Sequence, residues 1–375
     1  MKVLIFVCGE GLGHTTRCLA AGSRLVDEGA DVVYCAYGYS KKHLDDLGLR
    51  VLPIPSEIKL VGKSGSLSMR ASIGKSLRDM DPLGYPRIVD TIRKEDADLV
   101  ISDSYFLAAL ASKMLGRPII FILNQTNMYN FFRNRGIDVA LVGKVVKRFA
   151  EAVFKCVDYI VVPDFPPPYA ICEKNIEMTG QLVDKMEFTG PLVRKRPEEV
   201  DALDLEKPHV FSMVGGFGYR ERLFYNVIAT AESMQDYHFT LVSGPNVDLE
   251  HMRAKVTKNV RIIKYLDDVF PYIKASDVII APGGHTTIME AISFGKPLLS
   301  VPDMFHSEQQ NNSEKVSQLG IGMRLSYFTP PYMLEEFVKD SNKYAKNCSR
   351  MMKFSRKMDA PGRISEIAEE LTGSK

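Results

Sequence analysis

SDVIIAPGGHTTIMEAISFGKPLLSVPDMFHSEQQNN, residues 276–312, contains the pattern that decides the fold. An apolar run from Val278 to Ala281 predicts a short buried strand, and Pro282-Gly283-Gly284 ends it. His285-Thr286-Thr287 then opens a helical segment, with hydroxyls placed to cap it. Leu298 to Pro302 predict a second buried strand. A strand, a glycine turn, a helix and another strand are typical of an α/β fold with parallel strands.

The glycine turn before His285 predicts an anion-binding site. The first backbone N–H groups of a helix lack intrahelical partners, and the helix dipole places partial positive charge there. Glycines also let an anion come close, because they have no Cβ. Asp303 to Gln309 follow the carboxyl end of the second strand, where open α/β sheets bind their ligands. The stretch therefore favours a nucleotide-diphosphate ligand.

The same stretch resembles the donor-binding region of nucleotide-sugar glycosyltransferases with the GT-B fold, particularly the group containing MurG and the UDP-dependent glucuronosyl- and glucosyltransferases. The resemblance implies an α/β chain with two doubly wound, Rossmann-like lobes facing across a cleft. It implies a nucleotide sugar, UDP-linked by preference, as co-substrate and no other cofactor. The donor residues implied on this stretch are Gly283, Gly284, His285, Thr286 and Thr287 for phosphate, Glu290 for ribose, and Glu308 and Gln309 for the sugar.

Simpler interpretations of these residues remain open. Glu290 alone is equally well a residue that stabilises the helix dipole. Glu308-Gln309 alone is more typical of a solvated loop. Asn312 also falls where the family has asparagine, so it is the combination that points to a donor site.

Composition limits the other possibilities. A chain of 375 residues with 45% hydrophobic and 25% charged residues is globular and long enough for two domains. The net charge of +2 neither favours nor excludes an acidic partner, and we expect no nucleic-acid partner. The six cysteines contain no CxxC pair, so a zinc site or a disulfide framework is improbable. No apolar run reaches membrane-spanning length, and Val3 to Cys8 is too short for a signal peptide. We expect a cytoplasmic protein that is either free or peripheral on the membrane.

Apolar β-rich runs and helical segments alternate along the chain, which favours parallel sheets covered by helices on both faces. The predicted strands are Lys2–Cys8, Asp31–Tyr37, Leu99–Ser102, Ile119–Leu123, Tyr159–Val162, Val210–Val214, His238–Val242, Val260–Lys264, Val278–Ala281 and Leu298–Val301. The predicted domains are an acceptor-binding lobe, residues 1–190, and a nucleotide-sugar-binding lobe, residues 191–355. Residues 356–375 are expected to form a helix that crosses back to the first lobe.

The first glycine cluster, Gly9 to Gly13, is not a dinucleotide fingerprint. G-x-G-x-x-G would need glycine where His14 stands, and the strand Asp31–Tyr37 ends without the acidic residue that binds a ribose. Gly11 to Arg17 instead resembles the family's N-terminal G-x-G-H loop, which implies that Gly13 lies near the donor. In the glucosyltransferase branch this loop histidine is the general base and a later aspartate orients it.

By that resemblance His14 is the general base and Asp103 its partner. The chemistry is reasonable, because a neutral imidazole titrates near working pH and a carboxylate can fix its tautomer. Two structural alternatives stay open. His14 can instead brace the loop, and Asp103 can instead cap a helix spanning Ser104 to Lys113.

The second glycine cluster resembles the family's S-x-G-G-x-G loop against the donor diphosphate, which implies roles for Gly215, Gly216 and Gly218. The alternative is a tight strand-to-helix turn that needs glycine only for its dihedral angles. Leu266 falls in a segment whose backbone receives the nucleobase in the family. We find no D-x-D run suited to holding Mg²⁺ between phosphates, so no essential metal is expected.

The resemblance implies an inverting transfer of a sugar to a hydroxyl-bearing glycan, lipid or small-molecule acceptor. Two segments are candidates for contact with an anionic or membrane-borne acceptor: Ile58 to Arg78, and the mixed basic and apolar Asn130 to Lys155. For the latter, a core-packed amphipathic helix with a solvated basic face is the favoured alternative. Two other functions stay open, a non-hydrolysing UDP-sugar 2-epimerase and a non-catalytic nucleotide-sugar-binding protein.

Overall fold

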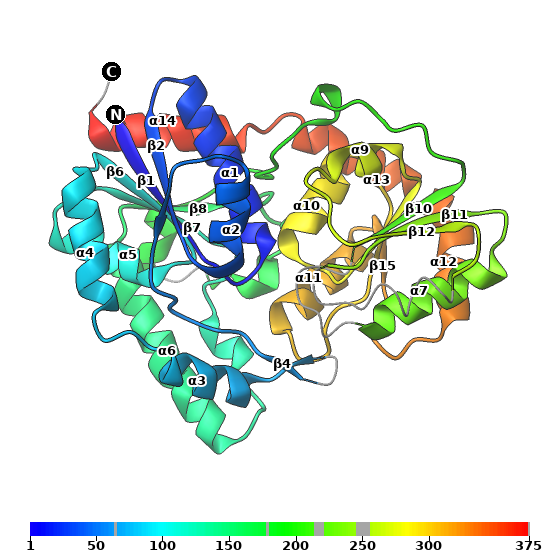
Figure 1. Cartoon of the computed structure of the whole chain (residues 1–375), viewed down its shortest axis with the longest axis horizontal. Coiled ribbons are helices and arrows are strands. Elements are labelled where there is room, and N and C mark those ends of the chain that lie inside the picture. The colour runs from blue at the N-terminus through cyan, green and yellow to red at the C-terminus, as the bar shows by residue number, and fades with distance from the viewer. Residues whose placement is uncertain (64–65, 178–179, 214–220, 245–255, 374–375) are drawn as a thin grey trace. The chain divides into compact units, whose positions relative to one another are not determined.

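The computed structural model describes residues 1–63, 66–177, 180–213, 221–244 and 256–373 (Figure 1). The chain divides into two compact units. Unit 1 comprises Met1–Val61, Ser68–Arg194 and Met358–Lys375, and unit 2 comprises Gly62–Leu67 and Lys195–Lys357. The chain therefore passes into unit 2 for six residues, 62–67, long before it enters that unit for good at Lys195.

Unit 1 is built on a seven-stranded sheet in the order β3-β2-β1-β6-β7-β8-β9, in which every pair is parallel. Its strands are β1 (Lys2–Val7), β2 (Asp31–Ala36), β3 (Val51–Pro53), β6 (Leu99–Asp103), β7 (Ile119–Ile122), β8 (Tyr159–Val162) and β9 (Met186–Phe188). The central strands are continuous apolar runs because both faces of the sheet are covered.

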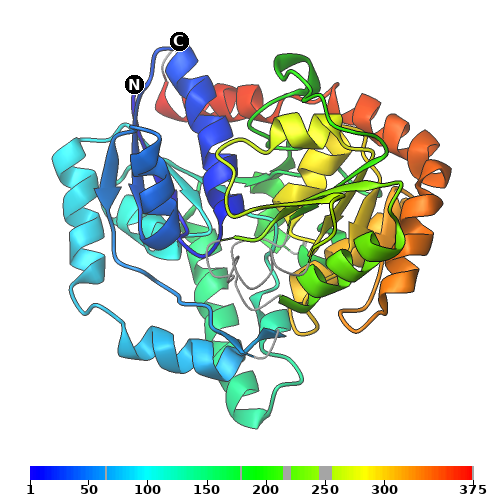
Figure 2. The same ribbon diagram turned by 45° about the vertical axis from the view of Figure 1, so that its right-hand side comes forward.

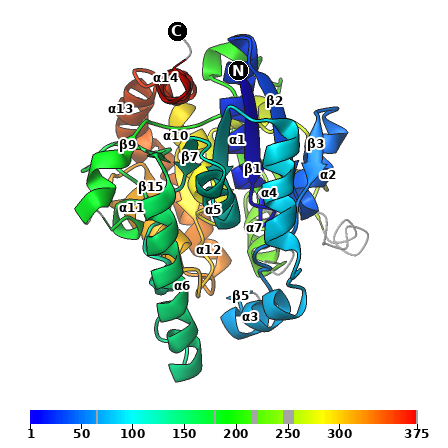
Figure 3. The same cartoon turned by 90° about the vertical axis from the view of Figure 1, so that its left-hand side faces the viewer.

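Helices cover the two faces of this sheet. They are α1 (Leu12–Asp27), α2 (Gly38–Asp46), α4 (Gly84–Glu95), α5 (Phe106–Met114), α6 (Ile137–Cys156) and α14 (Ala360–Thr372), and a further helix of the unit, α3 (Met69–Arg78), contributes no side chain to the two core clusters. One core cluster joins the sheet to α4, α5 and α6. Figure 3 shows these three helices. A second cluster on the other face contains buried side chains of α1, α2 and α14. The final helix thus belongs to unit 1, and Ile364 and Ile367 are fully buried there.

Unit 2 contains a six-stranded parallel sheet in the order β12-β11-β10-β13-β14-β15, with helices on both faces (Figure 2). Its strands are β10 (His209–Met213), β11 (His238–Val242), β12 (Val260–Ile263), β13 (Val278–Ala281), β14 (Leu298–Ser300) and β15 (Gly322–Arg324). Its helices are α7 (Glu221–Ser233), α9 (Phe270–Ala275), α10 (His285–Ser293), α11 (Ser307–Gln318), α12 (Pro331–Lys339) and α13 (Ala345–Ser355). A two-stranded antiparallel hairpin, β4 (Gly62–Lys63) and β5 (Ser66–Leu67), also lies in this unit.

Short 3-10 helices complete the described chain, at Met128–Phe131, Glu173–Asn175, Gly180–Lys185, Pro197–Glu199 and Ser341–Tyr344. In each sheet the strand order reverses once, between β1 and β6 in unit 1 and between β10 and β13 in unit 2. The carboxyl ends of the strands at such a reversal are where open α/β sheets bind ligands. The sequence of β strands therefore indicates one candidate site in each unit.

The predicted α/β class and the ten predicted strands are confirmed, with ends that differ by one residue or less, except that the predicted end Val214 lies outside the described residues. The sequence missed β3, β9, β15 and the hairpin. Each of these has three residues or fewer, and β9 carries a central glutamate, so none contains an apolar run long enough to indicate a strand.

Candidate functional site

His14 lies in the first turn of α1, so the interpretation of this segment as a loop is wrong. Gly11 precedes the helix with φ of 118°, a backbone conformation that glycine adopts readily, and the helix begins at Leu12. Gly13 is therefore also helical. A regular helix, and not a loop, therefore carries His14.

Asp103 is the last residue of β6, and it pairs in register with Val7 at the end of β1. Because α1 follows β1, His14 and Asp103 meet where the strand order of unit 1 reverses. The two side chains contact each other, with 2.7 Å between Nδ1 of His14 and Oδ1 of Asp103. Asp103 is fully buried, whereas a quarter of the His14 side chain, 25%, is exposed. The contact is the one that the family resemblance implied, and the roles of base and orienting acid stay a prediction.

The alternative role of Asp103 as a helix cap is wrong. Helix α5 begins only at Phe106, its N-cap is Tyr105, and no side chain of the cap residue bonds the helix. The N–H groups of Phe106 and Leu107 donate instead to the carboxylate of Glu57. Burial raises the pKa of Glu57 to about 7, although these two N–H groups oppose the shift.

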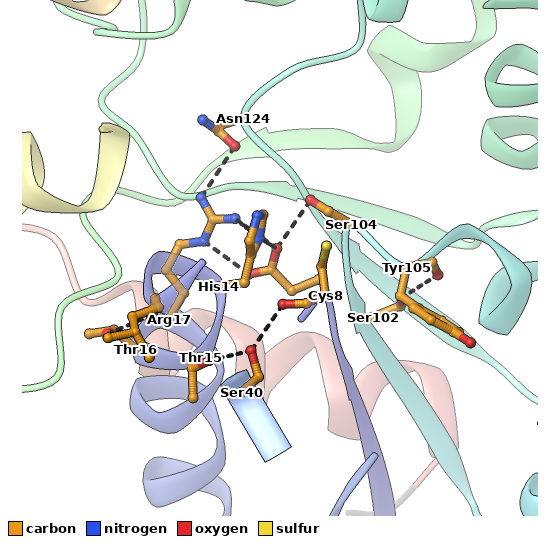
Figure 4. A network of polar contacts seen from close by, with 12 residues as sticks. Cys8, His14, Thr15, Thr16, Arg17, Ser40, Ser102, Ser104, Tyr105 and Asn124 are labelled. Atoms are coloured by element: carbon orange, nitrogen blue, oxygen red, sulfur yellow. Dashed lines mark hydrogen bonds and ion pairs between the residues drawn. The ribbon is translucent and has the colours of Figure 1, made fainter. Parts of the chain in front are cut away.

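Arg17, one turn after His14, is a site residue to which the sequence assigned no role. Its Nε and Nη2 donate to the two oxygens of Asp103 at 2.9 and 2.7 Å, and its Nη1 donates to Asn124 at 3.2 Å (Figure 4). Burial alone would raise the pKa of Asp103, but the charge of Arg17 and the contact with His14 lower it to about 2. The carboxylate is therefore ionised throughout the physiological range. The i, i+3 spacing of His14 and Arg17 on a helix was the signal that could have revealed this contact.

Two further bonds fix the frame of this site. Thr15 donates to Ser40 at 2.8 Å, and Ser40 donates to the carbonyl of Cys8 at 3.1 Å (Figure 4). All three residues are buried. The start of α1 is thus joined to α2 and to the end of β1, which holds the helix that carries His14 and Arg17.

In unit 2, the predicted glycine turn joins β13 to α10. Gly283 has φ of +85°, and a Cβ there would lie 2.3 Å from Oγ of Ser313, so packing demands glycine. Gly284 is the N-cap of α10 with φ of −64°, and a Cβ built there meets no described atom within 4 Å. Its glycine is therefore not required by local packing. The expectation that threonine hydroxyls cap the helix is wrong, because Gly284 occupies that position and Thr286 and Thr287 lie inside the helix.

The remaining predicted donor residues of this helix are mostly buried. His285, Thr286 and Glu290 are 3%, 8% and 6% exposed. Glu290 lies in the second turn of α10, one turn after Thr286. The turn and the helix follow β13, which borders the reversal in strand order of unit 2, so these residues lie where a ligand is expected.

Asn312 connects the glycine turn to the predicted sugar-binding acid. It is fully buried in α11, and its side-chain amide donates to the carbonyl of Gly283 at 3.3 Å and to Glu308 at 3.2 Å. The sequence placed Gly283 and Glu308 in one site, and a single buried side chain brings them together. Gln309 is also buried, and its Oε1 accepts a bond of 3.2 Å from the N–H of Asp303.

Asp303 is a buried acid that the sequence analysis left without a role. Its carboxylate accepts hydrogen bonds from the hydroxyl of Ser66, from the N–H of Leu67 at 3.0 Å and from the N–H of Phe305 at 2.8 Å. The backbone N–H of Asp303 donates to Oε1 of Gln309. One residue therefore fastens the β4–β5 hairpin and orients the predicted sugar-binding amide. Its position three residues after the end of β14 was the available signal.

Other predicted site residues differ in what the structure says of them. Leu266 is partly buried in the segment between β12 and α9. Gly215, Gly216 and Gly218 lie outside the described residues.

The chain also contains two D-x-D sequences, at 79–81 and 96–98, both in unit 1. Asp79 pairs with Lys59 and Lys75, each at 3.0 Å. Neither sequence lies in the unit with the glycine turn, and independence from metal stays a prediction.

Helix α6 presents two apolar surfaces. Val139, Ala150, Val153 and Phe154 are buried against unit 1, as a core-packed helix requires. A second stripe, at intervals of four residues, is exposed: Ile137 at 91%, Leu141 at 64%, Val145 at 65% and Phe149 at 42%. The core-packed interpretation therefore accounts for one face only. Within the described ranges, no helix is both long and apolar enough to cross a bilayer.

Comparisons with known proteins agree with this architecture. Residues 210–367 match the glycosyltransferase family 28 C-terminal domain. An uncharacterized glycosyltransferase of Methanosarcina acetivorans is 46% identical over 378 residues, which cover 100% of both chains. A UDP-N-acetylglucosamine–N-acetylmuramyl-(pentapeptide) pyrophosphoryl-undecaprenol N-acetylglucosamine transferase of Thermosipho africanus is 30% identical over 69% of this chain and 82% of its own length.

Among solved structures, the glycotransferase of kitacinnamycin superimposes with a TM-score of 0.73 at 18% identity, over 99% of this chain and 98% of that one. The crystal structure of Acinetobacter baumannii MurG gives a TM-score of 0.63 at 14% identity, over 98% and 99%. At these identities the likeness concerns the fold alone, and it confirms the predicted GT-B class. Together with the close full-length relative, it shows that this chain belongs to the GT-B glycosyltransferases.

Proposed function

We propose that this glycosyltransferase moves a sugar from a UDP-linked donor to a hydroxyl acceptor with inversion of configuration, and that His14 is the general base. The observation that carries the proposal is the contact of 2.7 Å between His14 and the buried, ionised Asp103. A carboxylate on Nδ1 leaves the other ring nitrogen available to a substrate. This is how paired histidine and acid residues activate hydroxyl groups.

The donor in this proposal binds to unit 2, with its diphosphate on the N-terminus of α10. Support comes from the helix terminus itself and from the open space beside Gly284. Glu290 would bind the ribose and Glu308 with Gln309 the sugar hydroxyls. The preference for uridine rests on the Thermosipho relative, whose name specifies a UDP-sugar.

The proposed reaction is a single displacement. His14 removes the proton of the acceptor hydroxyl while its oxygen forms a bond to the anomeric carbon from the face opposite the diphosphate. The bond between that carbon and the phosphate oxygen breaks, and UDP leaves with the electron pair. Helix N–H groups and the hydroxyls of Thr286 or Thr287 would stabilise the growing charge without reorganisation. We propose that this stabilisation replaces an essential metal.

We further propose that the acceptor is membrane-borne and that the chain docks peripherally through α6. The exposed stripe of four apolar residues lies beside the exposed basic residues Lys144 and Arg148. Apolar side chains next to basic ones suit an anionic lipid surface. The Thermosipho relative acts, by its name, on a pyrophosphoryl-undecaprenol compound, which is a lipid.

The test of the catalytic proposal has two stages. A thermal-shift panel of UDP-, GDP- and dTDP-sugars first identifies the donor. The selected donor is then incubated with vesicle-borne and water-soluble hydroxyl acceptors, and UDP release and product are measured together. We expect one UDP for each product and the opposite anomeric configuration in the product. The His14→Gln variant should lose 10²- to 10⁴-fold in turnover and still bind donor.

The other two functions predict different results. A 2-epimerase would convert the sugar without coupling UDP release to an acceptor. A non-catalytic binding protein would bind donor equally well before and after His14→Gln and would show no turnover in either form. Retention of the anomeric configuration, or full activity of the His14→Gln variant, would contradict the proposed mechanism. Loss of activity in EDTA that added Mg²⁺ restores would contradict metal independence.

A further inference from the structure

The chemistry proposed for His14 depends on which ring nitrogen carries the proton, and Arg17 bears on that question. Arg17 is 3% exposed, and its guanidinium binds both oxygens of Asp103. Its Nη2 also lies 3.0 Å from Nδ1 of His14. Nη2 of Arg17 and Nδ1 of His14 thus share Oδ1 of Asp103, each at 2.7 Å (Figure 4).

The donors and acceptors in this group allow one arrangement. A guanidinium only donates hydrogen bonds, and an ionised carboxylate only accepts them. Asp103 is ionised, since its pKa lies at about 2. A contact of 2.7 Å between this carboxylate and Nδ1 therefore requires a proton on Nδ1. Nη2 of Arg17 then donates to Oδ1 of Asp103. It lies close to Nδ1 of His14 because both nitrogens donate to that same oxygen.

We infer that Arg17 is a positioning residue that keeps Asp103 as an acceptor for Nδ1–H of His14 and so leaves Nε2 of His14 as the basic nitrogen. Arg17 also places a positive charge beside the carboxylate that faces the imidazole. Removal of Arg17 would leave the charge of Asp103 beside the imidazole without a neighbouring cation. The catalytic meaning of this arrangement rests on the proposed function, whereas the protonation pattern does not.

Other titratable and hydrogen-bonding groups lie near the pair of His14 and Asp103. Glu10 interacts electrostatically with His14, and its carboxylate accepts the N–H of Leu60 at 2.8 Å. Cys18 is buried near Asp103, and burial raises its pKa, so it stays neutral. Ser104 donates to Oδ1 of Asp103 at 3.2 Å and carries no charge. Glu10 is an acidic group that also acts on His14, so the variant Glu10→Gln serves as a comparison for the variants of Arg17.

The experiment is NMR of the full-length protein with ¹⁵N-labelled histidine and without substrate. His14 is one of seven histidines, and its signals are assigned by their loss in His14→Gln. In the unchanged protein we expect neutral His14 to carry its proton on Nδ1. In Arg17→Met the midpoint of the His14 titration should rise by about one pH unit, the smaller end of the effect of an opposite charge. Arg17→Lys should give a smaller rise, and Glu10→Gln should lower the midpoint.

An unchanged midpoint and tautomer in Arg17→Met, with signals of a folded chain, would overturn the inference and leave Arg17 a structural ion pair. A proton on Nε2 in the unchanged protein would also overturn it. If Arg17→Met does not fold, the titration midpoint and the tautomer of His14 are measured in Arg17→Lys, and an unchanged result there would overturn the inference. If the midpoint shifts as expected but His14→Gln still transfers sugar, the positioning role stands and the catalytic assignment of His14 fails.

Discussion

Asp103 shows how a site residue influences stability as well as chemistry. Its pKa falls from 3.8 to about 2 in the folded chain because Arg17 and His14 outweigh the effect of burial. A lowered carboxyl pKa contributes stability above the unfolded value, and this contribution is lost as the pH falls through the folded value. Asp103 therefore stabilises the fold at neutral pH and ceases to do so in acid.

We predict that Asp103→Asn lowers the free energy of unfolding by roughly 3 kcal/mol at pH 7, because Arg17 remains buried without a countercharge. The difference in free energy of unfolding between this variant and the unchanged protein should be smaller by roughly 1 kcal/mol at pH 3 than at pH 7. Urea unfolding at pH 7, 5 and 3 measures both quantities. A gap that is constant over this range would show that Asp103 does not titrate as described. Asp90, half-exposed in α4, provides a control, since Asp90→Asn should change stability little.

At the scale of elements, the β4–β5 hairpin is held by one residue of unit 2. Asp303 accepts the Ser66 hydroxyl and the Leu67 N–H, and all three residues are buried. Residues on either side of the hairpin, up to Val61 and from Ser68, belong to unit 1. The Asp303 contacts are therefore expected to control how firmly the hairpin is docked.

We predict that Asp303→Ala speeds hydrogen exchange at Leu67 by about 10²-fold, since a hydrogen bond to a charged group contributes roughly 1.5–3 kcal/mol. Ser66→Ala removes one neutral donor and leaves the Leu67 bond, so its effect on Leu67 should be at most about fivefold. Exchange measured by mass spectrometry on the peptide that contains residue 67 distinguishes the two variants. Equal exchange in both would mean that the hairpin is held by other contacts.

Helix α6 supports a prediction about membranes. Replacing Leu141 and Val145 together by serine removes the centre of the exposed stripe, and both side chains are more than half exposed, at 64% and 65%. The fold should be unaffected, whereas co-sedimentation with anionic vesicles should fall at least tenfold, because each apolar side chain contributes roughly 1 kcal/mol or more when buried. Tyr332→Ser in unit 2, where 59% of Tyr332 is exposed, is the matched control.

Two results would contradict the membrane prediction. If the unchanged protein stays in the supernatant with anionic and neutral vesicles alike, membrane contact is excluded. If the Leu141→Ser/Val145→Ser variant sediments as well as the unchanged protein, docking through α6 is excluded. Dependence on salt adds a further check, since attraction between basic residues and anionic lipid weakens as ionic strength rises.

At the scale of the whole molecule, the last helix stabilises the unit that contains the N-terminus. Ile367 of α14 is fully buried in the same cluster as Ile5 of β1. We predict that Ile367→Ala lowers the free energy of unfolding by about 2–5 kcal/mol. Hydrogen exchange should rise in unit 1 and much less in unit 2. Increased exchange confined to unit 2 would contradict the assignment of α14.

The sequence was sufficient to predict the α/β class and ten of the strands, because continuous apolar runs and glycine turns are local signals. It also brought together His14 with Asp103, and Gly283 with Glu308, through the resemblance to a family. It did not reveal Arg17 or Asp303. Their roles depend on buried ionic or hydrogen-bonded contacts with residues 86 and 237 positions away. The i, i+3 spacing of His14 and Arg17 and the position of Asp303 after a strand mark these residues, but such local patterns do not specify a partner that is distant in the sequence.

Gly284 gives the most direct test of the central claim, that the N-terminus of α10 binds the donor diphosphate. Aspartate is a favourable N-cap, and a Cβ at position 284 has room, so Gly284→Asp should leave the fold as stable or more stable. Its carboxylate would occupy the place of the phosphate and repel it. Calorimetric titration with UDP should therefore show an affinity for Gly284→Asp at least tenfold below that of the unchanged protein. Equal affinity for UDP in the two proteins, both folded, would contradict the account.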